Sequence, residues 1–311
     1  MNINRNTAIT SVVGWKLRVF VAIVLLAAGS TLNLCFADEA FKGDEGAKPY
    51  SHLKFQNNPN DFQFAVMGDR TGGGRAGVLP AAVDLLNVLR PEFVVNVGDL
   101  IEGYVEDEAQ LKSWWKDIDD DLERLDMPFF FVPGNHDVNF DPSEKVWFEH
   151  MNSDRSYSYF IYKDVLFLLI STEDPPKKDI EEEMEKSYYD VKAGKIDPQK
   201  AQEIIEELEE WAGQVSISDG QVEFFKEVLQ ANPNVRWTIG FMHTPAWTQP
   251  DPGNFAKIEA LLEDRPYTMF AGHTHTYNYT HRKGHDYITM GMTGALAPAH
   301  LTTGNMDHVA W

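Results

Sequence analysis

The stretch FVVNVGDLIEGY occupies residues 93–104 and shows the pattern from which the fold can be predicted. A short apolar run, Phe93 to Val97, is followed directly by Gly98 and Asp99. Runs of β-branched and aromatic residues of this length are typical of strands that are buried on both faces. Ligands of open α/β sheets bind where such strands end. We therefore predict an interior strand that carries a functional aspartate, Asp99, at its carboxyl end.

The same pattern recurs along the chain on both sides of this stretch. We expect strands at residues 62–67, 93–97, 129–132, 165–170, 235–242, 267–271 and 286–290. Amphipathic stretches separate them, and the short side chains of Asp107 and Ser218 are placed to cap two helices. This alternation of strands and helices predicts an α/β fold in which helices and sheets pack in layers.

Polar motifs follow five of these strands. They are Gly68-Asp69, Gly98-Asp99, Gly134-Asn135-His136-Asp137, His243 and Gly272-His273-Thr274-His275. Glycine before a ligand allows a sharp turn and a close approach of the backbone. Carboxylate, amide oxygen and imidazole groups suit borderline divalent ions such as manganese, iron or zinc. The motifs therefore predict a metal site whose ligands come from five places in the sequence.

In this order the motifs resemble the signature of the calcineurin-like metallophosphoesterase superfamily, from Asp69 to His275. The resemblance implies a sandwich of two central mixed β-sheets flanked by helices. It also implies two divalent metal ions, with Asp99 bridging both. One ion would be completed by Asn135, His243 and His273, and the other would be held by Asp69 and His275.

The resemblance also implies roles for His136 and Asp137. His136 would protonate the leaving-group oxygen or stabilise the charge that develops on it, and Asp137 would orient His136. Two adjacent cations can activate a shared water as hydroxide and offset the charge that builds up on phosphate. The implied activity is hydrolysis of a phosphate monoester or diester without a covalent protein intermediate.

The sequence departs from the family pattern at Thr71, which stands where the family usually has a histidine. One ion would therefore be short of a ligand. Purple acid phosphatases also lack that histidine and use a tyrosine three residues after the bridging aspartate, a position that corresponds to Glu102 here. Our hypothesis is that Glu102 supplies the missing oxygen ligand, with Tyr104 as a substitute.

The glycines at positions 72–74 and the arginines beside them are candidates for substrate binding. Their backbone amides could cradle phosphate, and Arg70 or Arg75 could clamp a substrate oxygen. We expect Asn135 and His136 to contact the phosphate as well. A flexible surface turn with solvated arginines explains Arg70 equally well and Arg75 better.

Two other functions are compatible with the sequence. The first is a non-catalytic protein on this fold that binds a phosphate ligand or acts as a scaffold, with one ion lost because of Thr71. The second is partner binding by an acidic segment at residues 177–214, which we expect to form a helical insertion. His136 favours an enzyme, because a site that only binds does not need a proton donor.

The first 37 residues have the features of an export signal. They contain three basic and no acidic residues, an apolar run from Val19 to Gly29, and a small-x-small site at Cys35 to Ala37. The run is shorter than the roughly 20 residues that cross a bilayer, so we expect no membrane span after cleavage. We expect a linker at residues 38–60, a phosphoesterase domain at residues 61–311, and a periplasmic or secreted protein.

The net charge and the cysteine content limit the kinds of partner and bond that we expect of the chain. The formal net charge is −21, and removal of the export signal would make it more negative. A strongly acidic chain without a basic patch is not expected to bind nucleic acid or anionic membranes. Cys35 is the only cysteine, so the exported chain would form no disulfide. The expected partner is a small phosphate ester or another phosphorylated substrate.

Overall fold

The computed structural model describes residues 41–43, 61–138, 141–175, 190–191, 193–197, 199–200, 203–204, 213–297 and 306–311. The expected export signal, most of the linker and most of the helical insertion lie outside the described residues. The chain divides into two compact units, Met1–Lys42 and Gly43–Trp311, and the fold below is that of the second. A short strand, β1 (Phe41–Gly43), lies at their boundary. Within the described part of the chain, no helix is long and apolar enough to cross a membrane.

One sheet has the strand order β11-β2-β3-β4. Strands β2 (Phe64–Met67), β3 (Phe93–Asn96) and β4 (Phe129–Phe131) are parallel, and β11 (Val309–Ala310) pairs antiparallel with β2. Nearly every residue of the three parallel strands is buried, which explains their continuous apolar sequence. Because Asn96 is paired with both Met67 and Phe131, the three strands end side by side. The motifs that follow them are brought together in this way.

The other sheet contains, in spatial order, β5 (Ser158–Tyr162), β6 (Val165–Leu169), β7 (Trp237–Phe241), β8 (Tyr267–Ala271), β10 (His285–Thr289) and β9 (Asn278–Arg282). Strands β6, β7, β8 and β10 are parallel, whereas β5 and β9 are antiparallel to their neighbours. The sequence predicted the four parallel strands close to their observed ranges and missed β5 and β9. Strand β9 is exposed along most of its length and β5 is only alternately buried, so neither has a continuous apolar run.

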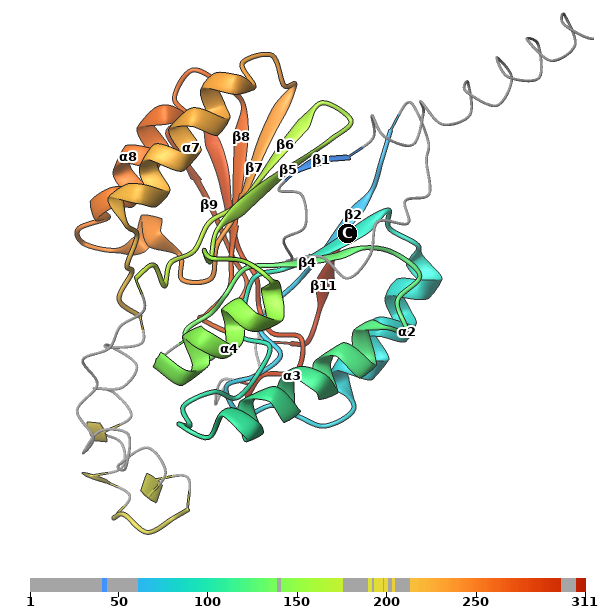
Figure 1. The fold of residues 1–311 in the computed structure, drawn as a ribbon, viewed down its shortest axis with the longest axis vertical. Helices are drawn as coiled ribbons and strands as arrows, with labels where there is room; N and C mark the ends of the chain where they lie inside the picture. Colours follow the sequence, from blue (N-terminus) through green and yellow to red (C-terminus); the bar gives the residue numbers. More distant parts are fainter. Residues whose placement is uncertain are drawn as a thin grey trace, which may run out of the picture. The chain divides into compact units, whose positions relative to one another are not determined.

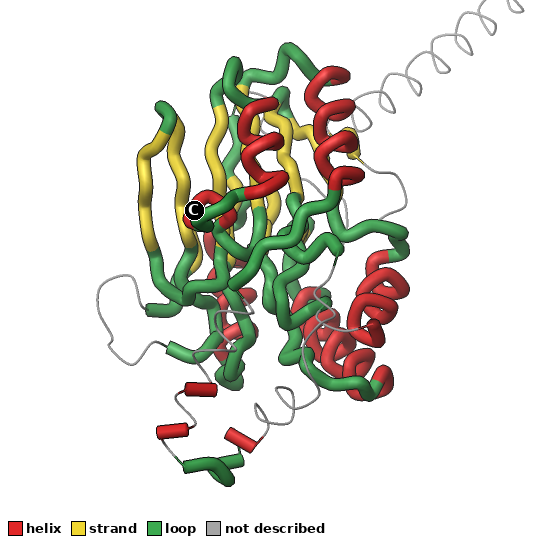
Figure 2. Tube along the Cα trace, turned by 90° about the vertical axis from the view of Figure 1, so that its left-hand side faces the viewer, coloured by secondary structure: helices red, strands yellow, loops and turns green. Residues whose placement is uncertain are grey.

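Helices cover the outer faces of both sheets (Figures 1 and 2). The first sheet is covered by α2 (Val78–Leu89), α3 (Glu108–Leu122) and α4 (Asp141–Met151). The second is covered by α7 (Asp219–Ala231) and α8 (Gly253–Leu261), with a short 3-10 helix, η1 (Ala246–Thr248), beside α8. Asp107 and Ser218 cap α3 and α7 as predicted. Asp107 accepts from two backbone N–H groups of the first turn, and Ser218 accepts from one.

The inner faces of the two sheets meet in a layer of phenylalanine rings. Phe130 stacks on Phe160 with ring centroids 4.0 Å apart, and the rings of Phe64 and Phe167 meet edge to face at 5.7 Å. Burial of one such side chain contributes roughly 1.5–3 kcal/mol. The two mixed sheets packed face to face and flanked by helices confirm the fold implied by the sequence.

Candidate metal centre and active site

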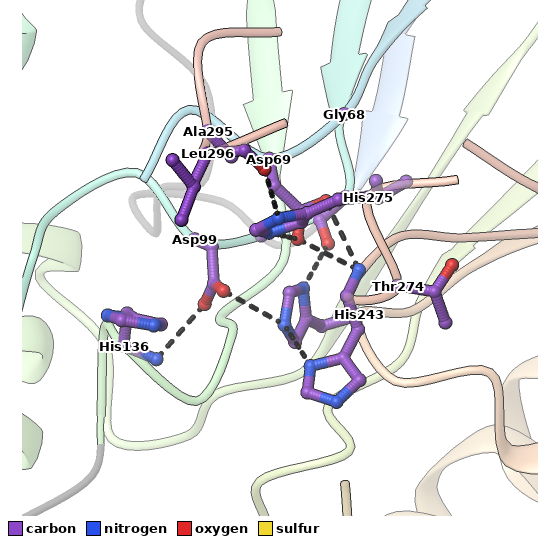
Figure 3. Close-up of polar contacts among 12 residues, drawn as sticks. Gly68, Asp69, Asp99, His136, His243, Thr274, His275, Ala295 and Leu296 are labelled. Atoms are coloured by element: carbon purple, nitrogen blue, oxygen red, sulfur yellow. Dashed lines mark hydrogen bonds and ion pairs between the residues drawn. The ribbon is translucent and has the colours of Figure 1, made fainter. Parts of the chain in front are cut away.

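The carboxyl ends of β2, β3, β4, β7 and β8 converge on one cluster of polar side chains (Figure 3). The structure brings together all six residues that the sequence predicted as principal metal ligands: Asp69, Asp99, Asn135, His243, His273 and His275. The two aspartates, Asn135 and His243 are buried, whereas His273 and His275 are half-buried. The cluster therefore opens toward solvent on the side of the His-x-His motif.

Four ligand atoms of this cluster lie at the spacing expected around one ion. Oδ1 of Asn135 is 2.9 Å from Nε2 of His243 and 3.0 Å from Nδ1 of His273. Nε2 of His243 is also 3.3 Å from Nδ1 of His273 and 3.2 Å from Oδ2 of Asp99. Atoms that lie about 2.1 Å from one metal ion, at right angles to each other, are about 3 Å apart. These residues therefore fit a shared cation.

Asp69 and His275 form a second group beside the first. Oδ2 of Asp69 is 3.4 Å from Nε2 of His275. Ligand atoms of Asp69, Asp99 and His243 all lie within 4.8 Å of one another. Asp99 is consequently close to both groups, as the family pattern implies for a bridging ligand. Figure 3 shows the side chains of Asp69, Asp99, His243 and His275 directed toward a common centre.

The glycines that precede the ligands are required by the close packing of the site. A Cβ atom at Gly134 would lie 2.1 Å from Oδ1 of Asp99, and one at Gly272 would lie 2.4 Å from Oδ1 of Asp69. Both distances are shorter than any normal non-bonded contact of a Cβ atom. Gly98 also has a φ of 99°, which other residues rarely adopt. The carboxylates of the site therefore pack directly against the backbone.

Several candidate ligands have left-handed backbone conformations. The φ angles are 58° for Asp99, 69° for His273 and 53° for His275. Such angles are uncommon outside glycine and cluster at functional sites. Hydrogen bonds hold these turns in place, since the backbone N–H of His273 donates to Oδ2 of Asp69 at 2.9 Å. The backbone turns that carry these ligands are thus fixed by hydrogen bonds to other residues of the site.

The contacts of Asp137 do not support its predicted role as the residue that orients His136. The carboxylate of Asp137 accepts hydrogen bonds of 2.9–3.0 Å from the backbone N–H groups of Asp99, Leu100, Ile101 and Gly134. The His136 ring is held instead by a 2.7 Å contact between its Nδ1 and the backbone oxygen of Glu102. The reason is that two sharp turns leave buried N–H donors that need an acceptor.

The electrostatics of the cluster favour positive charge. Burial alone would lower the pKa of His243, but the carboxylates of Asp99 and Asp69 outweigh this effect and raise it to about 10. Burial likewise opposes protonation of His275, yet its hydrogen bond with Asp69 raises its pKa. Burial raises the pKa of Asp99, but positive charge on neighbouring histidines holds it below its usual value. Burial, followed by the charge of Asp99, raises the pKa of Asp137 to about 7.

Thr71, which stands in place of the family histidine, lies next to this cluster. Its backbone N–H donates to the backbone oxygen of Asp99 at 3.0 Å. Its side chain is fully buried, and its Oγ1 has no hydrogen-bond partner in the described part of the chain. An unpaired buried hydroxyl is uncommon and calls for a polar partner. This observation, together with the donor set, fits a site that is completed by bound ions.

The carboxylate of Glu102 contacts the backbone of the glycine loop, residues 72–74. It is not among the grouped ligand atoms of Asp69, Asp99 and His243. Oε1 of Glu102 accepts a 2.6 Å hydrogen bond from the backbone N–H of Gly74. This contact does not support the hypothesis that Glu102 replaces the missing histidine as a metal ligand. This contact could not be predicted from the sequence, because the partner of Glu102 is a backbone group 28 residues away.

Tyr104 has a position that the sequence did not predict. Its hydroxyl accepts a 2.9 Å hydrogen bond from Nδ2 of Asn135, and its ring meets the His136 ring edge to face at 4.8 Å. This bond sets the orientation of the Asn135 amide, so that Oδ1 faces the two histidines. Tyr104 is thus a supporting residue for a candidate ligand rather than a ligand in place of Glu102.

The two arginines beside the glycine loop differ in their surroundings. Arg75 forms an ion pair with Asp307, and its Nε donates to the backbone oxygen of Ala295 at 2.9 Å. Arg75 therefore joins the carboxyl-terminal strand to the loop behind the site and is not placed as a substrate clamp. Arg70 donates a long hydrogen bond, 3.4 Å, to the backbone oxygen of Leu100. A role of Arg70 in substrate binding stays a prediction.

Residues 293–296 support the site from behind, through several backbone groups and the hydroxyl of Thr293. The backbone oxygen of Leu296 is 3.0 Å from Nδ1 of His275. The backbone N–H of Thr293 donates to the backbone oxygen of Asp69 at 2.8 Å, and its Oγ1 accepts from Gly68 at 3.1 Å. Contacts of this kind leave no signal in the sequence, because any residue type can supply a backbone group.

Comparisons with known proteins agree with this geometry. A family model described as calcineurin-like phosphoesterase matches residues 61–277. A search of curated proteins found no match. Among solved structures, a dimetal phosphatase from Danio rerio has a TM-score of 0.51 at 16% identity, over 75% of this chain and 88% of that chain.

A second similar structure is the purple acid phosphatase PPD1 from yellow lupin (Lupinus luteus) seeds. Its TM-score is 0.50 at 12% identity, over 80% of this chain and 48% of that chain. The present chain thus matches about half the length of the lupin enzyme. At such low identities the two structures show a shared fold, and the family rests on the match to residues 61–277. By that match, the chain belongs to the calcineurin-like phosphoesterase family and is a metal-binding hydrolase of phosphoric esters.

Proposed function

We propose that the chain hydrolyses a phosphate monoester or diester with two divalent ions held by the six converging residues. The observation that carries this proposal is the set of ligand atoms from Asp99, Asn135, His243 and His273, spaced at about 3 Å beside Asp69 and His275. Two bound cations would lower the pKa of a shared water and offset charge on the phosphate. The nitrogen and oxygen donors suit manganese, iron or zinc.

His136 is our candidate for the proton donor. Its Nδ1 lies 2.7 Å from a backbone oxygen of Glu102, which can only accept, so Nδ1 carries a proton. A proton on Nε2 could then pass to the leaving-group oxygen. The backbone N–H of His136 also donates to Oδ1 of Asp99 at 3.0 Å, which ties the proton donor to the central carboxylate.

Turnover of two chromogenic esters tests the proposed activity. Purified protein loaded with manganese should hydrolyse p-nitrophenyl phosphate, bis-p-nitrophenyl phosphate or both. A chelator should abolish the activity, and His243→Ala should lower it strongly. A folded, metal-loaded protein that turns over neither ester would instead be a phosphate-binding protein on this fold.

The role of His136 is tested by His136→Asn with two leaving groups. A general acid contributes about 10²–10⁴-fold, and less where the leaving group needs no proton. We therefore expect kcat to fall strongly for an alkyl phosphate and much less for p-nitrophenyl phosphate. Equal losses for both esters would exclude proton donation by His136.

We also propose that residues 1–37 form a cleaved export signal. The basic start, the short apolar run and the small residues at Cys35 and Ala37 support this proposal. Expression of the full chain in a bacterium and amino-terminal sequencing of the exported product should give a start at Asp38. A product in the cytoplasm that retains residues 1–37 would contradict it.

A further inference from the structure

We infer that Glu102 is a positioning residue whose carboxylate holds the glycine loop, residues 72–74, as a wall of the active site. The inference concerns the site described above, and it rests on the proposed function only where activity is measured. It replaces two expectations from the sequence, in which Glu102 was a metal ligand and the loop amides were a phosphate cradle.

The carboxylate of Glu102 is hydrogen-bonded to the backbone of the loop. Oε1 of Glu102 accepts from the backbone N–H of Gly74 at 2.6 Å, and Oε2 accepts a longer bond of 3.4 Å from Gly73. Hydrogen bonds to an ionised acceptor are shorter and stronger than those between neutral groups. Because these two amides already donate to a carboxylate of the same chain, they are not directed to a phosphate.

The loop lies beside the imidazole rings of the site. A Cβ atom on Gly72 would lie 3.0 Å from Cε1 of His275 and 3.7 Å from Nε2 of His136. On its other side, the backbone oxygen of Gly72 accepts a 3.1 Å hydrogen bond from Leu296. The loop therefore packs against the imidazoles of a candidate ligand and of the candidate proton donor.

The loop consists of three consecutive glycines, which by themselves would be flexible. Gly72 and Gly73 have φ angles of 86° and 82°, and three consecutive glycines have many accessible conformations when nothing restrains them. The Glu102 carboxylate restrains this segment, while its backbone oxygen holds the His136 ring. One residue thus fixes the distance between the loop and the proton donor.

The test compares Glu102→Ala with Glu106→Ala. Glu106 is an exposed glutamate of the same connection, so its removal changes the charge equally but leaves the loop untouched. Hydrogen exchange of the peptide spanning residues 72–75 should be faster in Glu102→Ala alone. The kcat/KM for p-nitrophenyl phosphate should fall about tenfold, with two metal ions still bound per chain. Glu102→Gln should restore part of the loss, since its amide oxygen can accept one of the two bonds.

Two results would overturn the inference. If Glu102→Ala bound one metal ion fewer per chain than the unchanged protein, Glu102 would be a metal ligand and not a positioning residue. Unchanged hydrogen exchange of residues 72–75 in Glu102→Ala would show that the Glu102 carboxylate does not hold the loop.

The same contact between Glu102 and Gly74 can be tested by a substitution in the loop. Gly74→Ala places a Cβ atom 3.1 Å from Oε1 of Glu102 and should also speed exchange in residues 72–75. In the double variant Glu102→Ala/Gly74→Ala the two effects should not add, because both act on one contact. Full additivity would overturn the inference. Hydrogen exchange needs no turnover, so an inactive protein would contradict the proposed function and leave this test intact.

Discussion

Oδ2 of Asp137 accepts a 2.9 Å hydrogen bond from the backbone N–H of Asp99, the residue at the centre of the site, whose φ is 58°. Asp137 follows β4 and Asp99 follows β3, so this bond joins the ends of two neighbouring strands. The same carboxylate oxygen also accepts from the N–H of Gly134 at 2.9 Å. The buried carboxylate thus holds both turns that present candidate ligands.

Replacement of Asp137 by asparagine should destabilise the protein. The new amide would place an NH₂ group against backbone donors that now bond to an oxygen. We expect the free energy of unfolding to fall by about 3 kcal/mol, because each unsatisfied buried donor costs about 1–3 kcal/mol. Urea unfolding of the metal-free protein measures this loss. Asp264→Asn, at an exposed position, is the control, and equal stability of both variants would contradict the assigned role.

Replacement of Tyr104 by phenylalanine should weaken metal binding and leave the fold intact. It removes the hydroxyl that accepts from Asn135 at 2.9 Å and keeps the ring that contacts His136. Loss of such an outer hydrogen bond typically lowers metal affinity about tenfold or more. Competition with a chromogenic chelator measures the change. An unchanged affinity would mean that the Asn135 amide is oriented by other contacts.

Replacement of Gly272 by alanine should abolish binding of at least one ion. The added Cβ would lie 2.4 Å from Oδ1 of Asp69 and 2.8 Å from Cγ2 of Val97, so the carboxylate would have to move. Gly220→Ala serves as the control, because a Cβ there meets its nearest atom at an ordinary 3.6 Å. Elemental analysis of the purified variants gives the number of ions per chain. Full occupancy in Gly272→Ala would be inconsistent with the described packing.

Metal binding should release protons and should strengthen as the pH rises. The pKa of His243 is raised to about 10, so near pH 7 its ring is protonated in the metal-free protein. A metal ligand must be neutral imidazole, so binding displaces this proton. The affinity should therefore increase from about pH 6 to pH 8, and calorimetry in buffers of different ionisation enthalpy counts the protons. A pH-independent affinity would show that His243 is already neutral.

Much of the fold and the six principal site residues could be predicted from the sequence. Interior strands are largely apolar runs because both of their faces are buried, and β2, β3, β4, β6, β7 and β8 were recognised for this reason. Strand β10 was also predicted, although its burial is only partial. The candidate site residues were recognised because they follow these strands, and all but His243 belong to a motif that contains a glycine. Both signals lie within a few consecutive residues, so they can be read without the fold.

Only the tertiary structure decided which residues support the site. The carboxylates of Glu102 and Asp137 bind backbone N–H groups that are 28 and 38 residues away, and Arg75 pairs with Asp307 across the chain. A backbone N–H is the same in nearly every residue, and an ion pair between distant positions produces no periodicity. The sequence by itself therefore determined the interior strands and the chemistry of the cluster. The fold decided the roles of the surrounding side chains, because these depend on which backbone groups are left without partners.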